Sequence, residues 1–190
     1  MDIYDNFFEP LISEKEILKR CEELGALITE KYKEDGLVAV GILRGCTLFY
    51  TELVKHIHCP LVFDFMFVSS YGNEMVSSGV VKIEKDLETN IKNKHVLLID
   101  DIIDTGKTLA NLKEMLQARN PKSIEFCTML DKKAKRESFV DVKFSAFDID
   151  DCFVVGYGLD YKQFYRNMPF IGKLIDGKQP ELDKFLEKFE

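Results

Sequence analysis

The chain has 190 residues, of which 46% are hydrophobic and 31% charged, a composition typical of a single folded domain and not of a disordered protein. Its formal net charge of −7 argues against a broad surface for nucleic acid. No apolar run approaches the ~20 residues that span a membrane, and the acidic start MDIYDNFFEP lacks the features of a secretory signal. The five cysteines are scattered, which argues against a disulfide framework. We therefore expect a cytoplasmic protein that binds neither nucleic acid nor a membrane.

Strands and helices are expected to alternate along the chain. Ser13 and Glu16 have the spacing of a capping box, so a helix is expected to begin after Ser13 and to end before Asp35-Gly36. The elements expected next, in chain order, are a strand over 37–42, a helix carrying the apolar residues from Leu48 to Ile57, a buried strand over 61–68, a half-exposed strand over 80–87, a buried strand over 96–100, a helix over 108–118, and strands over 123–130, 140–147 and 152–158. This order predicts an α/β fold with an open, mostly parallel sheet and helices on both faces.

Two segments differ from this pattern. Residues 69–79, SSYGNEMVSSG, are dominated by Ser, Gly and Asn, which predicts a loop longer than most connections. From Gly177 onward the sequence predicts a short amphipathic helix with Pro180 in its first turn. We expect this helix to dock on the body of the protein or on a second subunit, through a face made of Leu182, Phe185, Leu186 and Phe189.

The segment VLLIDDIIDTGKT, residues 96–108, carries the clearest chemical signal. In an open α/β sheet ligands bind beyond the carboxyl ends of the strands, and this buried strand ends in Asp100 and Asp101. Asp104–Thr108 then opens a helix, where free N–H groups and the helix dipole favour an anion. A helix cap would explain Asp104 alone, but not three carboxylates beside such a loop. The segment therefore predicts a phosphate site flanked by acids.

Two common nucleotide motifs are absent. A P-loop requires glycine where Asp101 stands, and Gly156 and Gly158 are followed by Tyr161 where a dinucleotide-binding turn needs a third glycine. Carboxylates beside a phosphate fit a ligand that has sugar hydroxyls and polyphosphate oxygens shared with Mg²⁺. We therefore interpret the segment as a sugar-phosphate site.

VLLIDDIIDTGKT resembles the phosphoribosyl-pyrophosphate (PRPP) motif of the type I phosphoribosyltransferases. Further segments are similar, in order and spacing, to the hypoxanthine–guanine members of that family, over roughly residues 10–175: LISEKEILKRCEELG, LRG at 43–45, SSYG…SSG…DL at 69–87, LDK at 130–132 and FVVGYGLDYKQFYRNMPFIGKL at 153–174. The resemblance implies the type I fold as a single domain over 1–190. It divides that domain into a core at about 37–147, a small hood lobe from the chain ends at about 1–20 and 150–175, and a helical tail at 177–190. It also implies Mg²⁺ and a homodimer or homotetramer.

The resemblance also implies roles for single residues at the sugar. Asp104 matches the carboxylate that faces N7 of the purine and acts as general base or acid. Asp100 and Asp101 match the pair that contacts the ribose hydroxyls and Mg²⁺, with Asp100 in place of the commoner Glu. The loop that holds the 5′-phosphate is matched by Thr105, Gly106, Lys107 and Thr108.

Other matched positions concern the leaving group and the lid. Arg44 stands where the family usually has Lys, which keeps the positive charge, and Cys46 stands where Gly is frequent. The segment with Ser70 and Tyr71 resembles a mobile lid that excludes water from the reacting centre. The positions matched to pyrophosphate contacts are Leu43, Arg44, Gly45 and Arg166.

The last group of matches concerns the base. Lys132 matches the ammonium that reads the purine 6-oxo group and so selects against adenine. Phe153 matches the ring that stacks on the base, and Val154 a source of backbone hydrogen bonds. Asp160 matches a residue beside the purine that provides a second Mg²⁺ position through water.

The implied reaction is displacement of pyrophosphate from C1′ of PRPP by a nitrogen of hypoxanthine or guanine, giving IMP or GMP in purine salvage. No Ser–His or Cys–His pair is evident, so positioning, Mg²⁺ and water exclusion are expected to supply the rate enhancement. Three alternatives stay open: a related enzyme that uses xanthine or a non-purine acceptor, a regulator that keeps the PRPP pocket without catalysis, and an inert α/β domain. The net charge of −7 counts against a regulator that senses RNA.

Overall fold

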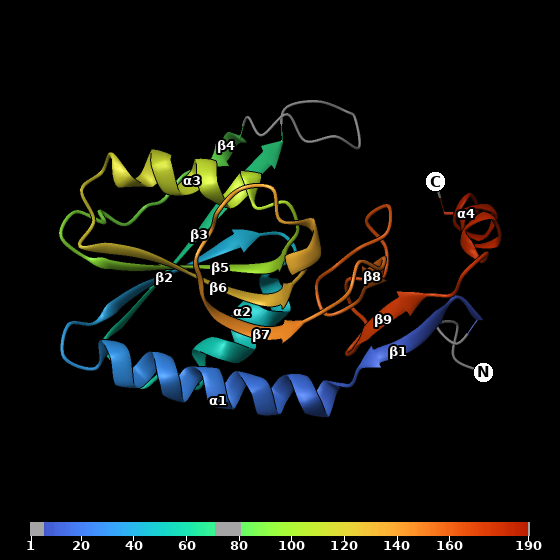
Figure 1. The fold of residues 1–190 in the computed structure, drawn as a ribbon, viewed down its shortest axis with the longest axis horizontal. Coiled ribbons are helices and arrows are strands. Elements are labelled where there is room, and N and C mark those ends of the chain that lie inside the picture. Colours follow the sequence, from blue (N-terminus) through green and yellow to red (C-terminus); the bar gives the residue numbers. More distant parts are fainter. Residues whose placement is uncertain (1–5, 71–80, 190) are drawn as a thin grey trace.

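The computed structural model describes residues 6–70 and 81–189. Figure 1 shows a larger sheet with helices on both sides and a smaller sheet beyond one of its ends. The α/β class expected from the sequence is confirmed. Of the predicted lid, Ser70 is the last residue of a strand and Tyr71 lies outside the described residues.

In the described part of the chain the larger sheet has six strands, in the order β4-β3-β2-β5-β6-β7. Neighbouring strands are parallel except for β3 and β4, which are antiparallel. The central strands are buried runs of apolar residues, as is usual for a parallel sheet covered on both faces. The strands are β2 (Leu37–Leu43), β3 (Leu61–Ser70), β4 (Val81–Lys85), β5 (His95–Ile103), β6 (Ser123–Asp131) and β7 (Val142–Asp148).

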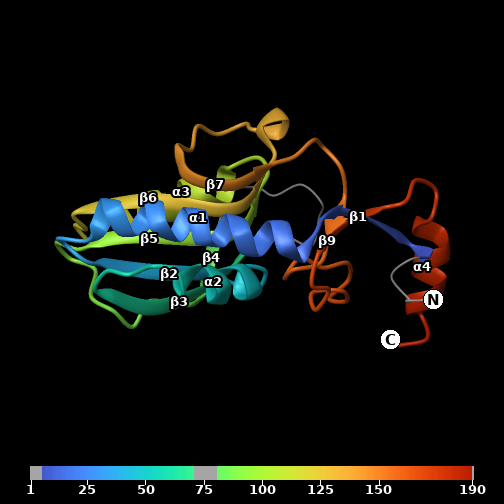
Figure 2. The same cartoon turned by 90° about the horizontal axis from the view of Figure 1, so that it is seen from below.

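Helices cover both faces of this sheet (Figures 1 and 2). α1 (Glu14–Tyr32) and α2 (Thr47–Val54) lie on one face, and α3 (Lys107–Gln117) lies on the other. The predicted capping box is present at the start of α1, where Glu16 N donates to Ser13 Oγ at 3.4 Å and Ser13 N donates to Glu16 Oε2 at 2.9 Å. Among the described residues, no helix combines the length and the hydropathy that crossing a membrane requires.

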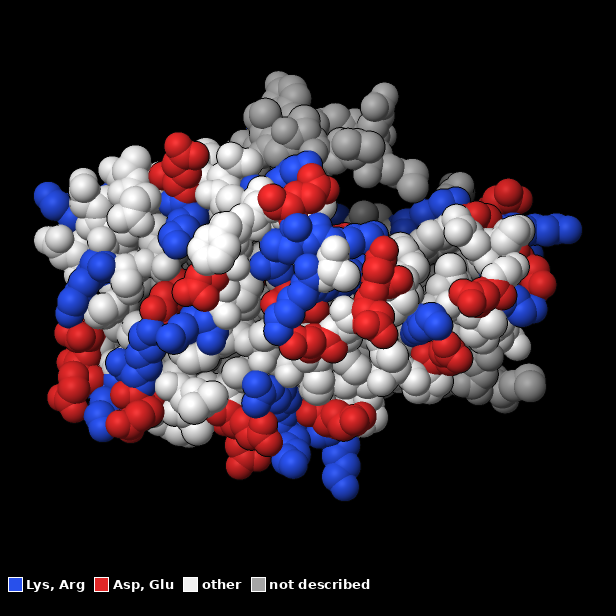
Figure 3. Space-filling view, viewed as in Figure 1, with Lys and Arg blue, Asp and Glu red and all other residues white. Residues whose placement is uncertain are grey.

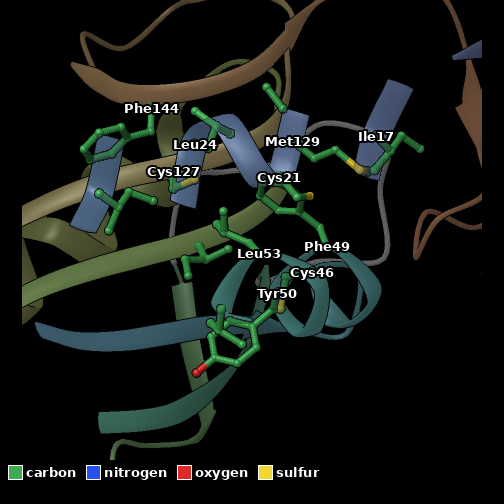
Figure 4. Packing of buried hydrophobic residues seen from close by; sticks show 14 of the residues in the cluster. Ile17, Cys21, Leu24, Cys46, Phe49, Tyr50, Leu53, Cys127, Met129 and Phe144 are labelled. Atoms are coloured by element: carbon green, nitrogen blue, oxygen red, sulfur yellow. The ribbon is translucent and has the colours of Figure 1, made fainter. Parts of the chain in front are cut away.

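Two hydrophobic clusters lie on opposite faces of the larger sheet. On one face, α1 and α2 pack on the strands through buried side chains that include Ile17, Cys21, Leu24, Phe49 and Leu53 (Figure 4). On the other face, α3 is held by Leu109, Leu112 and Leu116. The central strands are therefore fixed from both sides, and so are the loops that leave their carboxyl ends.

A smaller antiparallel sheet joins the two ends of the chain. Its order in the described residues is β1-β9-β8, with β1 (Phe8–Ile12), β8 (Val154–Val155) and β9 (Ile171–Leu174). This sheet, with strands from residues 8–12 and 154–174, is called the hood below. The C-terminal helix α4 (Gln179–Leu186) docks on it, so the tail packs on the body of its own chain.

The segment 152–158 differs from the single strand expected there. Only Val154 and Val155 are in a strand, because Gly156, Tyr157 and Gly158 have φ of 94°, 48° and 106° and turn the chain. A Cβ on Gly158 would lie 1.9 Å from the carbonyl oxygen of Gly45. The turn therefore brings the segment after β8 directly against the loop that follows β2.

The strand expected at 61–68 is longer and less buried than predicted. Val62 and Phe63 are 44% and 56% exposed. β4 pairs only with Phe67–Ser70 at the far end of β3, so the first half of β3 is an edge of the sheet. An apolar run in the sequence does not reveal which half of a strand has a neighbour.

Candidate active site

The loop that follows β2 and the carboxyl-terminal part of β5 meet at one edge of the larger sheet, because β2 and β5 are parallel neighbours. β2 ends at Leu43, Arg44 and Gly45 follow it, and β5 contains Asp100 and Asp101. A Cβ on Gly45 would lie 1.5 Å from Oδ2 of Asp101. Glycine is therefore required at position 45, since only a residue without a side chain lets the backbone approach this carboxylate.

A first cavity, of about 420 Å³, opens beside this contact. Arg44 and Arg166 bring two guanidinium groups to its wall, and Asp100 and Asp101 bring two carboxylates. The Arg44 guanidinium lies over the ring of Phe67, 5.2 Å from its centroid. All six residues predicted for pyrophosphate or for the pair of acids line this one cavity: Leu43, Arg44, Gly45, Asp100, Asp101 and Arg166.

The two adjacent aspartates hold their protons more tightly than usual. Burial raises the pKa of Asp100 well above its ordinary value of 3.8, and the neighbouring Asp101 carboxylate raises it further. Burial also raises the pKa of Asp101, against hydrogen bonds from Asp100 and from the Ile102 N–H that lower it. Ionising this pair is therefore costly until a ligand or a cation compensates the charge.

Cys46, where the family often has glycine, is an unreactive part of the core. Burial raises the pKa of its thiol, and Asp100 and Asp101 raise it further, so the thiol stays neutral. Its φ of −63° and ψ of −14° are helical values that any residue adopts. Cysteine therefore replaces glycine here without backbone strain.

A second cavity, of about 550 Å³, adjoins the first at Asp101, which lines both. Lys132 is only 7% exposed, and its Nζ lies 4.0 Å from Oδ1 of Asp151. Phe153, at 46% exposure, is a large aromatic side chain left open at the cavity wall. The five residues predicted to face the base all line this cavity: Asp104, Lys132, Phe153, Val154 and Asp160.

Asp104 has an unused acceptor at this second cavity. Its Oδ1 is buried and accepts no hydrogen bond from any residue that the structure describes. Buried polar atoms are nearly always paired, so an unpaired oxygen on a residue that lines a cavity fits a ligand that supplies the donor. Asp104 therefore offers an acceptor, and Lys132 a donor, to the same space.

The loop from Thr105 to Thr108 forms the start of α3. Its N-cap residue, Gly106, has φ of 81° and no side chain to cap the helix, and the Lys107 N–H makes only a long contact, 3.4 Å, with Thr105 Oγ1. A helix N-terminus with so little capping suits an anion. Asp104 does not cap the helix. The loop is braced from outside, because Thr105 O accepts from both Glu137 N and Ser138 N at 3.0 Å. The two cavities described above are lined by other residues, so the structure places this loop beside them and not in their walls.

Gln163 is a site residue that the sequence did not indicate. Its side-chain oxygen accepts from Arg166 Nη2 at 3.1 Å and from Arg44 Nη1 at 3.3 Å, and it lines the first cavity. Arg166 is held further by Asp160 at 2.7 Å and by the carbonyl oxygen of Gly158 at 2.8 Å. Gln163 thus joins the two guanidinium groups of the cavity without neutralising either. No local pattern marks this residue, because its partner Arg44 is 119 positions away.

Arg136 is a second residue that the sequence did not indicate. Its guanidinium pairs with the buried carboxylate of Asp131 and donates from Nε to the carbonyl oxygen of Asp104 at 3.3 Å. A Cβ on Gly106 would lie 2.9 Å from its Cδ. Arg136 therefore holds the segment that carries Asp104 and the start of α3.

One face of the molecule can be followed in Figure 3. On the face shown in Figure 3, Lys and Arg side chains are interspersed with Asp and Glu. Together with the net charge of −7, this leaves the binding of an anion to local groups such as Arg44 and Arg166.

Comparison with known proteins defines the class to which this site belongs. Residues 11–162 match the family model described as phosphoribosyl transferase domain. That stretch includes the Gly45–Asp101 contact, the start of α3, Lys132 and Phe153.

Individual relatives narrow the class to which the chain belongs. The chain is 50% identical over 164 residues to a hypoxanthine-guanine phosphoribosyltransferase of Bacillus subtilis, with 86% of this chain and 91% of the relative covered. It is 49% identical over 169 residues to a hypoxanthine phosphoribosyltransferase of Escherichia coli, covering 88% and 95%. A crystal structure of a hypoxanthine phosphoribosyltransferase from Staphylococcus aureus matches with a TM-score of 0.89 and 44% identity, covering 96% and 97%. The chain therefore belongs to the hypoxanthine–guanine phosphoribosyltransferases, a family of transferases.

Proposed function

We propose that this protein transfers the 5-phosphoribosyl group of PRPP to hypoxanthine or guanine, giving IMP or GMP and pyrophosphate in purine salvage. The observation that carries the proposal is the pair of adjoining cavities that share Asp101. One has two guanidinium groups, which suit a pyrophosphate, and the other has an open aromatic ring, a lysine and an unpaired carboxylate oxygen, which suit a purine. The ribose, which is bonded to pyrophosphate before the reaction and to the purine after it, would lie between the two cavities against Asp101.

The second cavity supports a 6-oxopurine as acceptor. We assign the Lys132 ammonium to the 6-oxo group, the Phe153 ring to the face of the base, and the Val154 backbone to its edge. Adenine would present an N–H donor to the Lys132 donor, so both groups would be left unpaired. The unpaired oxygen of Asp104 is assigned to the purine N–H at N7.

The reaction then needs a proton acceptor and a stabilised leaving group. The bond from C1′ to a purine nitrogen forms as the bond from C1′ to the pyrophosphate oxygen breaks, and the purine proton passes to the Asp104 carboxylate. Arg44 and Arg166 bind the pyrophosphate, and the backbone N–H groups at 43–45 face it. The start of α3 is assigned to the 5′-phosphate. We assign the segment with Ser70 and Tyr71 to a lid over this centre.

The residues at the first cavity fit Mg²⁺. This ion is usually bound by one or two carboxylates together with substrate phosphates. Asp100 and Asp101 place two carboxyl groups on the cavity wall, and a bound cation would lower the cost of ionising them. Among the described residues, no three acids, cysteines or histidines are grouped into a metal cage, which suits an ion that arrives with PRPP. Asp160 already contacts Arg166 and the Gln163 N–H, so it is assigned a position through water. When bound, Mg²⁺ would neutralise charge on the leaving group.

One assay tests this function. The protein is incubated with PRPP and Mg²⁺ and with hypoxanthine, guanine, xanthine or adenine in turn, and nucleotide formation is followed chromatographically. We expect product with hypoxanthine and guanine and none with adenine. Failure with every base would overturn the proposal, and PRPP binding without product would indicate a regulator. Product with xanthine alone would indicate the related enzyme.

We also propose a homodimer or homotetramer that works in the cytoplasm. Self-association is supported by the exposed Val62 and Phe63 on the edge half of β3. All five cysteines lie in the described ranges and are free thiols, which suits a reducing compartment. Analytical ultracentrifugation checks the assembly, and a monomer at assay concentrations would contradict it.

A further inference from the structure

The C-terminal helix α4 is anchored on the hood by its apolar face. Leu182 and Leu186 are almost completely buried, and Tyr165 and Met168 belong to the same cluster. Phe7, which precedes β1, and Phe8, the first residue of β1, belong to this cluster too. The position of α4 relative to the neighbouring turn at 160–166 is therefore fixed by packing.

The polar side of α4 reaches that turn through Asp183, and Gln179 of the same helix also interacts with the Tyr161 side chain. Asp183 Oδ1 accepts from the hydroxyl of Tyr161 at 2.8 Å and contacts Lys162 Nζ at 2.8 Å. The turn itself is closed by backbone bonds, with Tyr161 N donating to Phe164 O at 3.1 Å and Phe164 N donating to Tyr161 O at 2.9 Å. Asp183 thus fixes the Tyr161 side chain on a backbone that does not depend on it.

Tyr161 in turn contacts the ring at the second cavity. The rings of Tyr161 and Phe153 meet edge-on, with centroids 5.4 Å apart and planes at 85°. The backbone of Phe153 is tied to β9, since Leu174 N donates to its carbonyl oxygen at 3.1 Å. The side chain is nearly half exposed, so the Tyr161 contact limits the orientations of a ring that solvent would otherwise leave free.

We propose that α4 is a positioning element for the purine subsite, in which Asp183 holds Tyr161 and Tyr161 holds the ring of Phe153 in the orientation that stacks on the base. This inference rests on the proposed function. The other side of the same turn is held separately, because Arg166 is bound by Asp160, Gln163 and the Gly158 carbonyl. Loss of Asp183 therefore affects the base and leaves the pyrophosphate side in place.

Steady-state kinetics of Asp183→Ala tests the inference, with KM measured separately for hypoxanthine and for PRPP. Because Asp183→Ala removes one hydrogen bond, we expect KM for hypoxanthine to rise about two- to tenfold. We expect KM for PRPP and kcat to stay unchanged within about twofold. Tyr161→Phe, which removes only the hydroxyl, is expected to change KM for hypoxanthine in the same direction. Asp183→Asn keeps an acceptor oxygen for Tyr161 and is expected to stay near wild type.

The matched control is Glu181→Ala on the same helix, because Glu181 is exposed and its ion pair among the described residues is local, with Lys178 at 2.7 Å. It is expected to leave both KM values unchanged. A double-mutant cycle with Phe153→Leu adds a readout that general destabilisation would not give, since Asp183→Ala should have little further effect once the ring is gone. Equal effects of Asp183→Ala with and without Phe153, or equal rises in both KM values, would overturn the inference. A wild-type protein that makes no nucleotide would instead overturn the proposed function.

Discussion

Asp104 is the residue on which the proposed chemistry depends most directly. Asp104 lines the second cavity, its buried Oδ1 has no partner among the described residues, and the amide of Asp104→Asn cannot take a proton there. We expect turnover to fall by ~10²–10⁴, the usual contribution of a general acid–base group. The rise in melting temperature on adding PRPP should persist, since Asp104 does not line the first cavity. Asp141→Asn, on the exposed surface, is the control, and unchanged turnover in Asp104→Asn would remove the assigned role.

Gln163 supports a different prediction, because a neutral oxygen joins two cations there. Gln163→Glu would convert both contacts into ion pairs and occupy the guanidinium groups that the leaving group needs. We expect KM for PRPP to rise about tenfold or more, with KM for hypoxanthine little changed. The increase should shrink at high salt if charge is its cause. An unchanged KM for PRPP would show that Gln163 does not hold these arginines.

At the scale of elements, the segment 131–138 supports the loop that opens α3. Arg136→Ala leaves the 4% exposed Asp131 without its ionic partner. We expect a loss of about 3–5 kcal/mol in the free energy of unfolding, as is usual when one partner of a buried pair is removed. Lys133→Ala breaks an exposed pair with Asp148 in the same segment and should cost only about 0–1 kcal/mol. Urea denaturation measures both, and equal losses would contradict the bracing role.

The elements also show what the sequence could and could not reveal. The strands at 37–42 and 96–100 were predictable because burial on both faces gives an unbroken apolar run. The turn at 156–158 was not, because its positive φ values at Tyr157 and two glycines depend on contacts with Gly45 and Phe170. The same holds for the candidate site. The acids of β5 form a local motif that can be read from the sequence, whereas Gln163 belongs to the site only through its contact with Arg44, which follows β2 and is distant in sequence.

For the whole molecule, the acidic pair links stability to pH. Folding raises the pKa of Asp100 above its ordinary value of 3.8, so the folded state binds this proton more tightly than the unfolded state does. The folded state therefore loses stability as the pH rises from 3.8 toward the raised pKa of Asp100. Asp100→Asn removes this cost, and we expect a higher melting temperature at about pH 7.5 and a smaller gain at about pH 5. Each kcal/mol gained corresponds to about 2–4 °C.

The same variant separates stability from function. Because Asp100 belongs to the pair that fits Mg²⁺, we expect Asp100→Asn to gain less from PRPP with Mg²⁺ in a thermal-shift experiment than the wild type does. A variant that is less stable at neutral pH, or equally stabilised by the ligand, would contradict this account.

The pairing of β1 with β9 governs when the protein can become active during its synthesis. Phe8–Ile12 is synthesised before every strand of the larger sheet, and its partner Ile171–Leu174 is synthesised after all of them. The larger sheet can fold while β1 still waits as an unpaired edge. Asp104 and Lys132 are then already in place, but Phe153 and Asp160 gain their support only when the hood closes. A nascent chain that has not yet made β9 therefore has Asp104 and Lys132 but no supported Phe153, so the complete base site forms only after β9 is made.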